Sequence, residues 1–386
     1  MPQPPADLLK ARHARVRAAL TRERLDALVV FHLPNIRYLT GFAGSAAILV
    51  LTEDDLTLVT DGRYVTEVEK TVVPGCPGLR LVKVDPAYDA TLARLLKAGS
   101  GLRIGFESAH LTVNRFEWLS AALGGSAAGF PDAGPLVGAE RLVEAARIRK
   151  DAFEQAIFRR AGALLDAVAA HVLNGVKAGQ RERDVAADID DRVRRGGFER
   201  PAFDTIVASG PHAALPHARP GDRVLQAGDL VVLDFGGVCD GYCVDITRTV
   251  SIGEPGPEAR RLYEAVAESQ VAAVRVIRPG AAVTDVDEAA RAVLEGHGLG
   301  PAFSHATGHG LGLEIHEEPR VGPRRTDIPG VPPAGRDEVL EAGVVFTVEP
   351  GAYVAGFGGV RIEDDVLVTD DGVAWLTSVP RELRVV

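Results

Sequence analysis

The second half of the chain carries four carboxylates and a histidine in segments that are otherwise apolar or rich in glycine. They are Asp234 and Asp245 in LDFGGVCDGYCVDITRT, His309 in HATGHGLGLEIHE, Glu349 in TVEPG and Glu363 in VRIED. Unpaired charge is costly among Val, Leu, Ile and Phe, so a cation between these groups explains them better than solvated strand residues would. Carboxylate and imidazole ligands suit a bridged pair of Mn²⁺, Co²⁺, Fe²⁺ or Zn²⁺ ions. The set therefore predicts a metallohydrolase.

The two aspartates are expected on a β-hairpin. Asp240 and Gly241 stand between two β-prone runs, and Asp-Gly is a strong hairpin-turn signal. The register that follows pairs Val238 with Cys243, Gly236 with Asp245 and Asp234 with Thr247. Because side chains alternate between the faces of a strand, Asp234 and Asp245 then share one face on the diagonal.

Three histidines, His305, His309 and His316, occur within one short glycine-rich run. The i, i+4 spacing of the first two is found in helical zinc motifs, but the glycines around His309 make a helix improbable here. In an extended or loop conformation, glycine lets a metal or substrate approach the backbone. Any one of these histidines has a structural alternative, whereas three together favour a site.

Bulk composition is typical of an ordinary soluble enzyme. A length of 386 residues predicts two domains, and a formal net charge of −10 argues against nucleic-acid or anionic-membrane partners. The N-terminal segment has no apolar run of the secretory type, so we expect a cytoplasmic protein. Cys76, Cys239 and Cys243 are too few for a disulfide framework, and no further cysteine lies near the last two to complete a thiolate zinc site.

The pattern of predicted elements changes near residue 150. Before it, a helix over 8–25, a strand at 26–32, a hairpin at 46–60 and a strand at 102–107 predict a small α/β domain. The segment at about 134–155 is expected to connect it to the second domain. After it, helices are expected at 151–175, 182–196, 257–276 and 283–297, with short strands rich in Gly and Val.

The motifs together resemble the creatinase/aminopeptidase family of "pita-bread" metallopeptidases, in the proline-directed branch that contains aminopeptidase P and prolidase. SGPHAALPHA, DFGGVCDGYCVDITRT, HATGHGLGLEIHE, EPGAY and GGVRIED keep the order and spacing of that family. The resemblance implies an α+β fold, with a pita-bread catalytic domain at 146–386 and a smaller creatinase-like α/β domain at 1–145, where RYLTGFAGS and TDGRY occur. Methionine aminopeptidases typically lack such an N-terminal domain. Ala306 stands where relatives more often have Gly or Ser, which leaves the ligands untouched.

The same resemblance implies a role for each residue of the site. Two divalent ions, most simply manganese, would be held by Asp234, Asp245, His309, Glu349 and Glu363, with Glu349 also receiving the proton of the attacking water. His217 and His316 look like the histidines that contact the substrate carbonyl. His305 resembles a residue of the nearby substrate pocket, and Tyr353 resembles a residue that contacts the metal ligands rather than the metal. Arg361 resembles the family's arginine that supports the carboxylate ligands. Creatinase lacks this ligand set, and its metal-free chemistry is therefore not expected.

The implied substrate is a peptide with proline at its second position. An Xaa-Pro aminopeptidase is preferred, because RYLTGFAGS and TDGRY are similar to the short bacterial aminopeptidase P type; an Xaa-Pro dipeptidase is the alternative. The dipeptidase needs a cation for the free C-terminus, usually an arginine. The Pro- and Arg-rich segment 320–340 is expected to be a surface loop; the alternative is that Arg320, Arg324 or Arg325 in it meets a substrate carboxylate or a partner subunit. A non-catalytic peptide-binding protein is less consistent with five retained ligands. The resemblance also implies a homodimer.

Overall fold

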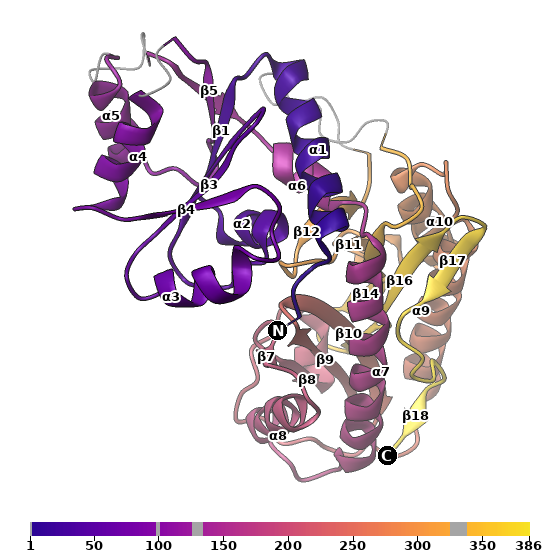
Figure 1. Ribbon diagram of the computed structural model, residues 1–386. Helices are drawn as coiled ribbons and strands as arrows, with labels where there is room; N and C mark the ends of the chain where they lie inside the picture. Colours follow the sequence, from indigo (N-terminus) through magenta and orange to yellow (C-terminus); the bar gives the residue numbers. More distant parts are fainter. Residues whose placement is uncertain (1, 98–100, 126–133, 325–337) are drawn as a thin grey trace. The chain divides into compact units, whose positions relative to one another are not determined.

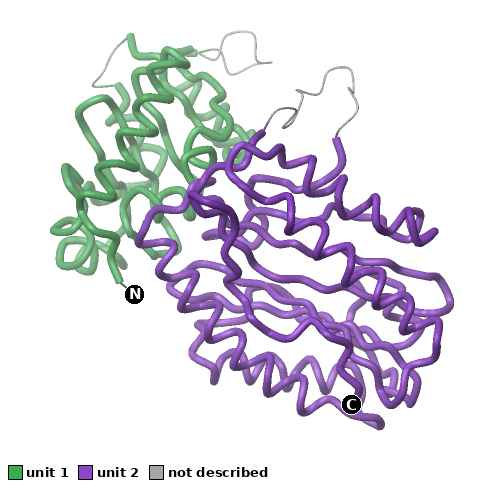
Figure 2. The backbone as a smooth tube through the Cα atoms, turned by 90° about the vertical axis from the view of Figure 1, so that its right-hand side faces the viewer, with its two compact units in different colours: residues 1–147 green, residues 148–386 purple. Residues whose placement is uncertain are grey.

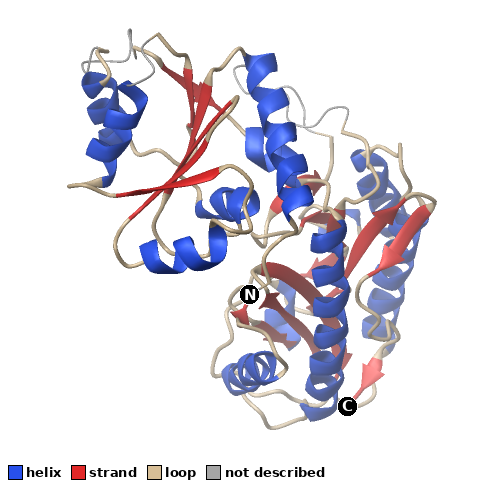
Figure 3. Cartoon of the chain, viewed as in Figure 1, coloured by secondary structure: helices blue, strands red, loops and turns tan. Residues whose placement is uncertain are grey.

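The structure is a computed structural model that describes residues 2–97, 101–125, 134–324 and 338–386. It contains two compact units, residues 1–147 and residues 148–386, which are coloured separately in Figure 2. Each unit is built from helices packed on mixed or antiparallel sheets, as the cartoon in Figure 3 shows. The expected α+β class is confirmed.

The first unit is a six-stranded mixed sheet with helices on both faces (Figure 1). Its strand order is β4-β3-β2-β1-β5-β6. The strands are β1 (Ala27–Val30), β2 (Ile48–Thr52), β3 (Leu56–Thr60), β4 (Leu79–Lys83), β5 (Ile104–Glu107) and β6 (Leu136–Ala139). The helices are α1 (Ala6–Glu23), α2 (Leu33–Thr40), α3 (Val65–Glu67), the π-helical turn η1 (Val68–Val72), α4 (Tyr88–Lys97), α5 (Val113–Ala122) and α6 (Leu142–Arg147).

The first sheet of the second unit contains the long hairpin β9 (Leu230–Cys239) and β10 (Tyr242–Ser251). Its order is β18-β10-β9-β7, and β8 also pairs with β9. The short strands are β7 (Arg200–Pro201), β8 (Ile206–Ser209) and β18 (Arg384–Val385), and the 3-10 turn η2 (Gly210–Ala214) follows β8. Helices α7 (Ala152–Gly175) and α8 (Glu182–Arg195) cover this sheet through one apolar cluster that includes Leu165, Ile189, Leu233 and Ile246.

The second sheet of this unit has the order β12-β11-β13-β16-β17. Its strands are β11 (Gly308–Gly310), β12 (Glu317–Val321), β13 (Val345–Val348), β16 (Asp364–Thr369) and β17 (Gly372–Trp375). A separate pair, β14 (Gly351–Val354) and β15 (Gly358–Arg361), lies between β13 and β16 in the sequence. Helices α9 (Pro257–Arg275) and α10 (Val283–Gly296) pack on this part through a second apolar cluster, and the 3-10 turn η3 (Gly300–Ala302) follows α10.

Most predicted elements are present within two residues of their expected ends. The prediction for 134–155 was wrong in its first part, because β6 pairs in parallel with β5 and α6 follows it, so both belong to the first unit. The four-residue run of β6 is short and contains a glycine, which made it resemble a linker. The three cysteines are free and buried. Within the described ranges, no helix has the length and apolar character needed to cross a bilayer.

Candidate metal centre and peptide site

The β9–β10 hairpin has the predicted register. Asp240 and Gly241 form the turn with positive φ angles of 45° and 80°, and Asp234 pairs with Thr247 as Asp245 pairs with Gly236. Leu233 and Ile246 point into the core under α7 and α8, so alternation puts Asp234 and Asp245 on the opposite face. Gly236 is required between them, because a Cβ there would lie 2.2 Å from the Val244 carbonyl oxygen.

The other three predicted ligands come from the second sheet and its loops. His309 is the central residue of β11, Glu349 follows β13, and Glu363 lies between β15 and β16. The Glu363 amide donates to the Thr247 carbonyl (3.1 Å), which joins this segment to the hairpin by an isolated antiparallel bridge. The Glu349 amide donates to the Thr307 carbonyl (2.7 Å).

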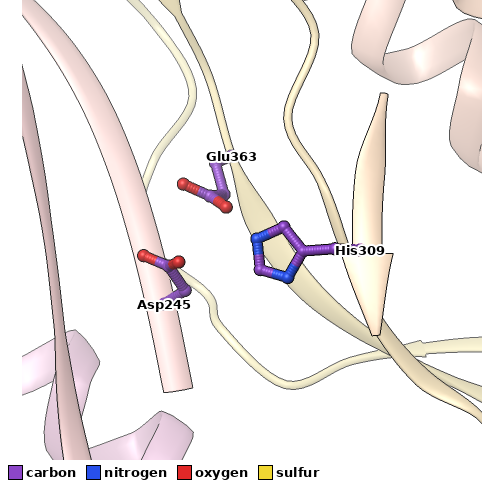
Figure 4. A group of neighbouring side chains, drawn as sticks. All are labelled: Asp245, His309 and Glu363. Atoms are coloured by element: carbon purple, nitrogen blue, oxygen red, sulfur yellow. The ribbon is translucent and has the colours of Figure 1, made fainter. Parts of the chain in front are cut away.

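Three of the five residues converge tightly. Asp245, His309 and Glu363 point toward one another (Figure 4). Each offers a ligand atom, and these atoms all lie within 4.8 Å of one another. The Glu349 carboxylate lies next to this group, with Oε1 3.6 Å from His309 Nε2. Asp234 is outside the tight group and forms an ion pair with Arg361 through Oδ2.

The ring of His309 is oriented for metal binding. Its Nδ1 lies 3.2 Å from the Gly310 carbonyl oxygen, which can only accept a hydrogen bond. A proton on Nδ1 satisfies this carbonyl and leaves the Nε2 lone pair on the side of Glu349. Histidine ligands typically donate their other ring N–H to a carbonyl in this way.

The carboxylates repel one another in a buried setting. Burial, followed by the negative charges of Glu363 and Asp234, raises the pKa of Asp245 well above its ordinary value. Burial, followed by Glu349 and Asp234, does the same to the pKa of Glu363. Burial raises the pKa of Glu349 to about 8, although the Arg361 charge opposes it. Burial lowers the pKa of His309 to about 4, so the imidazole is neutral near pH 7.

These groups fit divalent cations. Oδ1 of Asp234 and Oδ1 of Asp245 are buried, and neither has a hydrogen-bond partner among the described residues. An unpaired buried carboxylate oxygen is expensive, and a cation satisfies it while removing the repulsion between neighbouring carboxylates. The oxygen-rich donor set with one imidazole suits hard or borderline ions rather than a thiolate-type zinc site.

Arg361 connects the candidate ligands to the predicted substrate side. Its guanidinium is bonded to Asp234, donates from Nε to Thr247 Oγ1 (3.1 Å) and donates from Nη1 to the Tyr353 hydroxyl (2.8 Å). His305 Nδ1 lies 2.7 Å from the Ala306 carbonyl oxygen, so Nε2 accepts from the Tyr353 hydroxyl at 2.9 Å. Burial lowers the pKa of His305 to about 4, which keeps this ring neutral.

His217 and His316 are exposed at the same site. The His316 ring lies 4.3 Å from the His309 ring, centroid to centroid, in an edge-to-face arrangement. His217 follows η2, and Arg361 Nη1 donates to the carbonyl of its neighbour Pro216 (3.2 Å). Burial and the positive charge of His217 lower the pKa of His316, while Asp234 opposes them. The structure thus gathers all the residues predicted for substrate contact near Asp234 and His309, but their roles stay predictions.

Several supporting residues were missed by sequence reasoning. Thr247 Oγ1 donates to Glu363 Oε2 (2.5 Å), and Asp365 Oδ2 accepts from the Asp245 amide (3.0 Å). On α10, Asp287 Oδ1 accepts from the Thr307 amide (3.1 Å), and Arg291 Nη2 donates to the His305 carbonyl (2.5 Å). Asp365 carried the signal used for the ligands, a charge within an apolar strand pattern. Asp287 and Arg291 carried none, because charged residues are ordinary in helices.

The Pro- and Arg-rich segment is only partly described. Arg320 is exposed on β12, where it pairs in register with His309, and Arg324 is also exposed. Arg325 lies outside the described residues. The proposed contact of one of these arginines with a substrate carboxylate stays a prediction.

Comparison with known proteins gives the family. Residues 156–370 match metallopeptidase family M24, and residues 12–148 match the creatinase/prolidase N-terminal domain. An Xaa-Pro dipeptidase of Pyrococcus horikoshii is 33% identical over 384 residues, which cover 98% of this chain and 99% of that protein. The solved structure of an Xaa-Pro dipeptidase from Bacillus anthracis superposes with a TM-score of 0.89 at 33% identity, covering 98% of this chain and 100% of that one.

An X-Pro aminopeptidase from Thermotoga maritima is similar as well. Its structure superposes with a TM-score of 0.82 at 32% identity, covering 97% of this chain and 99% of that one. The expected pita-bread fold with a creatinase-like N-terminal domain is therefore confirmed. The chain belongs to metallopeptidase family M24 and carries a creatinase/prolidase N-terminal domain.

Proposed function

We propose that this metallopeptidase hydrolyses the Xaa-Pro peptide bond with two divalent metal ions, most simply Mn²⁺. The observation that carries the proposal is the convergence of Asp245, His309 and Glu363 beside Glu349, with three further histidines on the same side. Relatives that align over nearly the whole chain are named Xaa-Pro dipeptidase or X-Pro aminopeptidase, which supports the substrate class. When bound, the ions would lower the pKa of a water molecule and polarise the scissile carbonyl.

The side chains then have separate tasks. Asp234, Asp245, His309 and Glu363 would hold the ions, and Glu349 would be both a ligand and the proton acceptor. Its carboxylate would take the proton of the attacking water and pass it to the proline nitrogen, which has no hydrogen of its own in the peptide. His217 and His316 would donate hydrogen bonds to the carbonyl oxygen as negative charge develops there, worth about 3–4 kcal/mol for a well-placed donor.

The finer proposal is an aminopeptidase that accepts peptides longer than two residues. Arg361 and Arg291, two described arginines bonded to residues of the site, already use their guanidinium groups on Asp234, Tyr353, Asp287 and the His305 carbonyl. They are therefore poorly placed to bind a free C-terminal carboxylate. The dipeptidase alternative is favoured by the names of several relatives and would depend on Arg320, which lies opposite His309.

A substrate series tests whether the protein cleaves Xaa-Pro bonds and whether it does so as an aminopeptidase or as a dipeptidase. Manganese-loaded enzyme is given Ala-Pro, Ala-Pro-Ala and Ala-Ala-Ala, and the released alanine is measured. We expect cleavage of both proline peptides and none of Ala-Ala-Ala. Cleavage of Ala-Pro alone, lost in Arg320→Met, establishes the dipeptidase instead. A purified protein that binds no metal and cleaves neither proline peptide is a non-catalytic binding protein, which would overturn the proposal.

A further inference from the structure

Gln270 is a buried amide on α9 that contacts the segments carrying two of the candidate ligands. Its side chain is 1% exposed, although it stands on a helix whose other buried residues are mostly apolar. Nε2 donates to the Val348 carbonyl (3.2 Å), the Ile362 carbonyl (3.4 Å) and Asp364 Oδ2 (2.9 Å). Val348 directly precedes Glu349, and Ile362 directly precedes Glu363.

A single amide group thus holds two backbone positions that are adjacent in space but 14 residues apart in sequence, as the residue numbers show. An amide nitrogen has two N–H groups, so two of its three acceptors share one of them. Because the carbonyls of Val348 and Ile362 bond to the same nitrogen, the distance between them is fixed. Because each belongs to the residue before a ligand, this distance also sets the separation of Glu349 and Glu363.

The third acceptor, Asp364, anchors this arrangement. Its carboxylate is fully buried and also accepts from Arg248 Nη2 (2.8 Å), Thr377 Oγ1 (2.8 Å) and Arg381 Nε (2.7 Å). Arg248 in turn donates to the Glu363 carbonyl (2.5 Å) and to the Thr247 carbonyl (2.9 Å). The backbone on both sides of Glu363 is thus fixed by side chains that do not themselves line the metal site.

Fold stability alone does not explain the amide. Gln270 Oε1 is buried and has no hydrogen-bond partner within the described part of the chain. An unsatisfied buried oxygen lowers stability; an apolar side chain of the same length would avoid that cost, but it would remove the donor from the Val348 and Ile362 carbonyls and from Asp364. Its neighbour Ser269 is different: its hydroxyl is fully buried and donates to the Ala290 carbonyl (2.9 Å), which ties α9 to α10 and not to a ligand strand.

The geometry points to Gln270 as a positioning residue that sets the spacing of Glu349 and Glu363 and so tunes metal affinity. The inference rests on the proposed two-metal function. Removing a residue that orients a metal ligand typically lowers metal affinity by about 10–100-fold. Gln270→Met keeps the length of the side chain and removes both donors, so we expect Mn²⁺ to bind about 10–100-fold more weakly to this variant.

The experiment compares full-length wild type, Gln270→Met and Ser269→Ala by calorimetric titration of the metal-free proteins with Mn²⁺. Thermal unfolding of the same metal-free samples reports on folding. The absorption bands of the Co²⁺-loaded proteins report on coordination geometry. We expect altered Co²⁺ bands and weaker Mn²⁺ binding in Gln270→Met alone, whereas Ser269→Ala lowers the unfolding temperature with wild-type affinity and bands.

A second variant covers the case in which Gln270→Met does not fold. Gln270→Glu keeps the size of the side chain but places acceptor oxygens against two carbonyls and Asp364, so we expect at least as large a loss of affinity. Folded variants that bind Mn²⁺ within twofold of wild type, or an equal loss in Ser269→Ala, would overturn the inference. A folded wild type that binds no Mn²⁺ would instead remove the proposed function and this inference with it.

Discussion

Glu349 differs from the other carboxylates of the site in what surrounds it. Its side chain is 18% exposed, and its oxygens lie 3.6 Å from His309 Nε2 and 4.0 Å from His305 Nδ1. Glu363, by contrast, is 2% exposed and is fixed by the Thr247 hydroxyl. A group that is both partly open and raised in pKa to about 8 is suited to receive and release a proton near neutral pH.

Replacing Glu349 by glutamine removes the proton acceptor with little change in size. We expect kcat for Ala-Pro-Ala to fall by at least about 100-fold, the usual contribution of a positioned acid–base group. Steady-state kinetics of the metal-loaded variant give the value. Glu341→Gln is the matched control, because Glu341 is an exposed residue of the same segment that pairs with Arg149. Full activity in Glu349→Gln would show that another group moves the proton.

At the scale of elements, glycine lets β11 lie close to β13 on one side and to β12 on the other. A Cβ at Gly308 would lie 1.8 Å from the Thr347 carbonyl oxygen, and one at Gly310 would lie 2.3 Å from the Glu318 carbonyl oxygen. His309 stands between these two glycines, and its amide donates to Thr347 Oγ1 (3.1 Å). The close approach of the strands therefore fixes where the imidazole meets Asp245 and Glu363.

Gly308→Ala forces β11 away from β13. We expect a loss of about 1–3 kcal/mol in the free energy of unfolding, as for other overpacked sites, and weaker Mn²⁺ binding because His309 moves with the strand. Urea unfolding and metal titration measure the two effects. Gly296→Ala is the control, since a Cβ at the end of α10 meets no atom within 4 Å. Wild-type stability and affinity in Gly308→Ala would mean that the strands separate without cost.

At the scale of the whole molecule, the site concentrates negative charge where the two sheets of the second unit meet. Asp245 comes from the first sheet, Glu363 directly precedes β16 of the second sheet, and both have raised pKa values through burial and the negative charge of neighbouring carboxylates. Without metal, these groups hold protons in the folded protein that the unfolded chain releases at lower pH. Bound metal offsets the repulsion between the buried carboxylates, and it therefore links folding to metal binding.

Metal removal should make stability depend on pH in a defined window. Folding raises the pKa values of these carboxyl groups above those of the unfolded chain, which lie near 4. Their contribution to the free energy of unfolding is therefore complete below pH 4, and for Glu349 it is lost as the pH rises through about 8. His305, His309 and His316, whose pKa values are lowered by burial, act in the opposite direction only below about pH 6.5. Between pH 6.5 and 8, metal-free protein is therefore expected to lose about 1.4 kcal/mol per pH unit for each carboxyl still protonated.

Chemical unfolding at pH 6.5, 7.25 and 8, with EDTA or with Mn²⁺, measures this dependence. The loaded protein should be more stable throughout and nearly independent of pH, because the metal keeps the carboxylates ionised. Metal-free protein that is equally stable at all three pH values would contradict the electrostatic account of the site.

The sequence alone determined the parts of the site that are local. An Asp-Gly turn and strict side-chain alternation fix the register of a hairpin, so the placement of Asp234 and Asp245 on one face was predictable. The five candidate ligands were found because charges inside apolar strand patterns are conspicuous, and the family followed from several motifs in order. The short strand β6 was missed because four residues carry too little periodicity.

Only the tertiary structure decided which distant segments meet. Three long-range contacts join residues that are 78 or more positions apart: the pairing of Thr247 with Glu363, the ion pair of Arg361 with Asp234, and the hydrogen bonds of Gln270 to two ligand-bearing loops. No periodicity encodes such contacts, because they depend on how helices and sheets pack after each has formed. Residue types and local register therefore specify the ligands, whereas long-range packing sets the distances between them that metal binding requires.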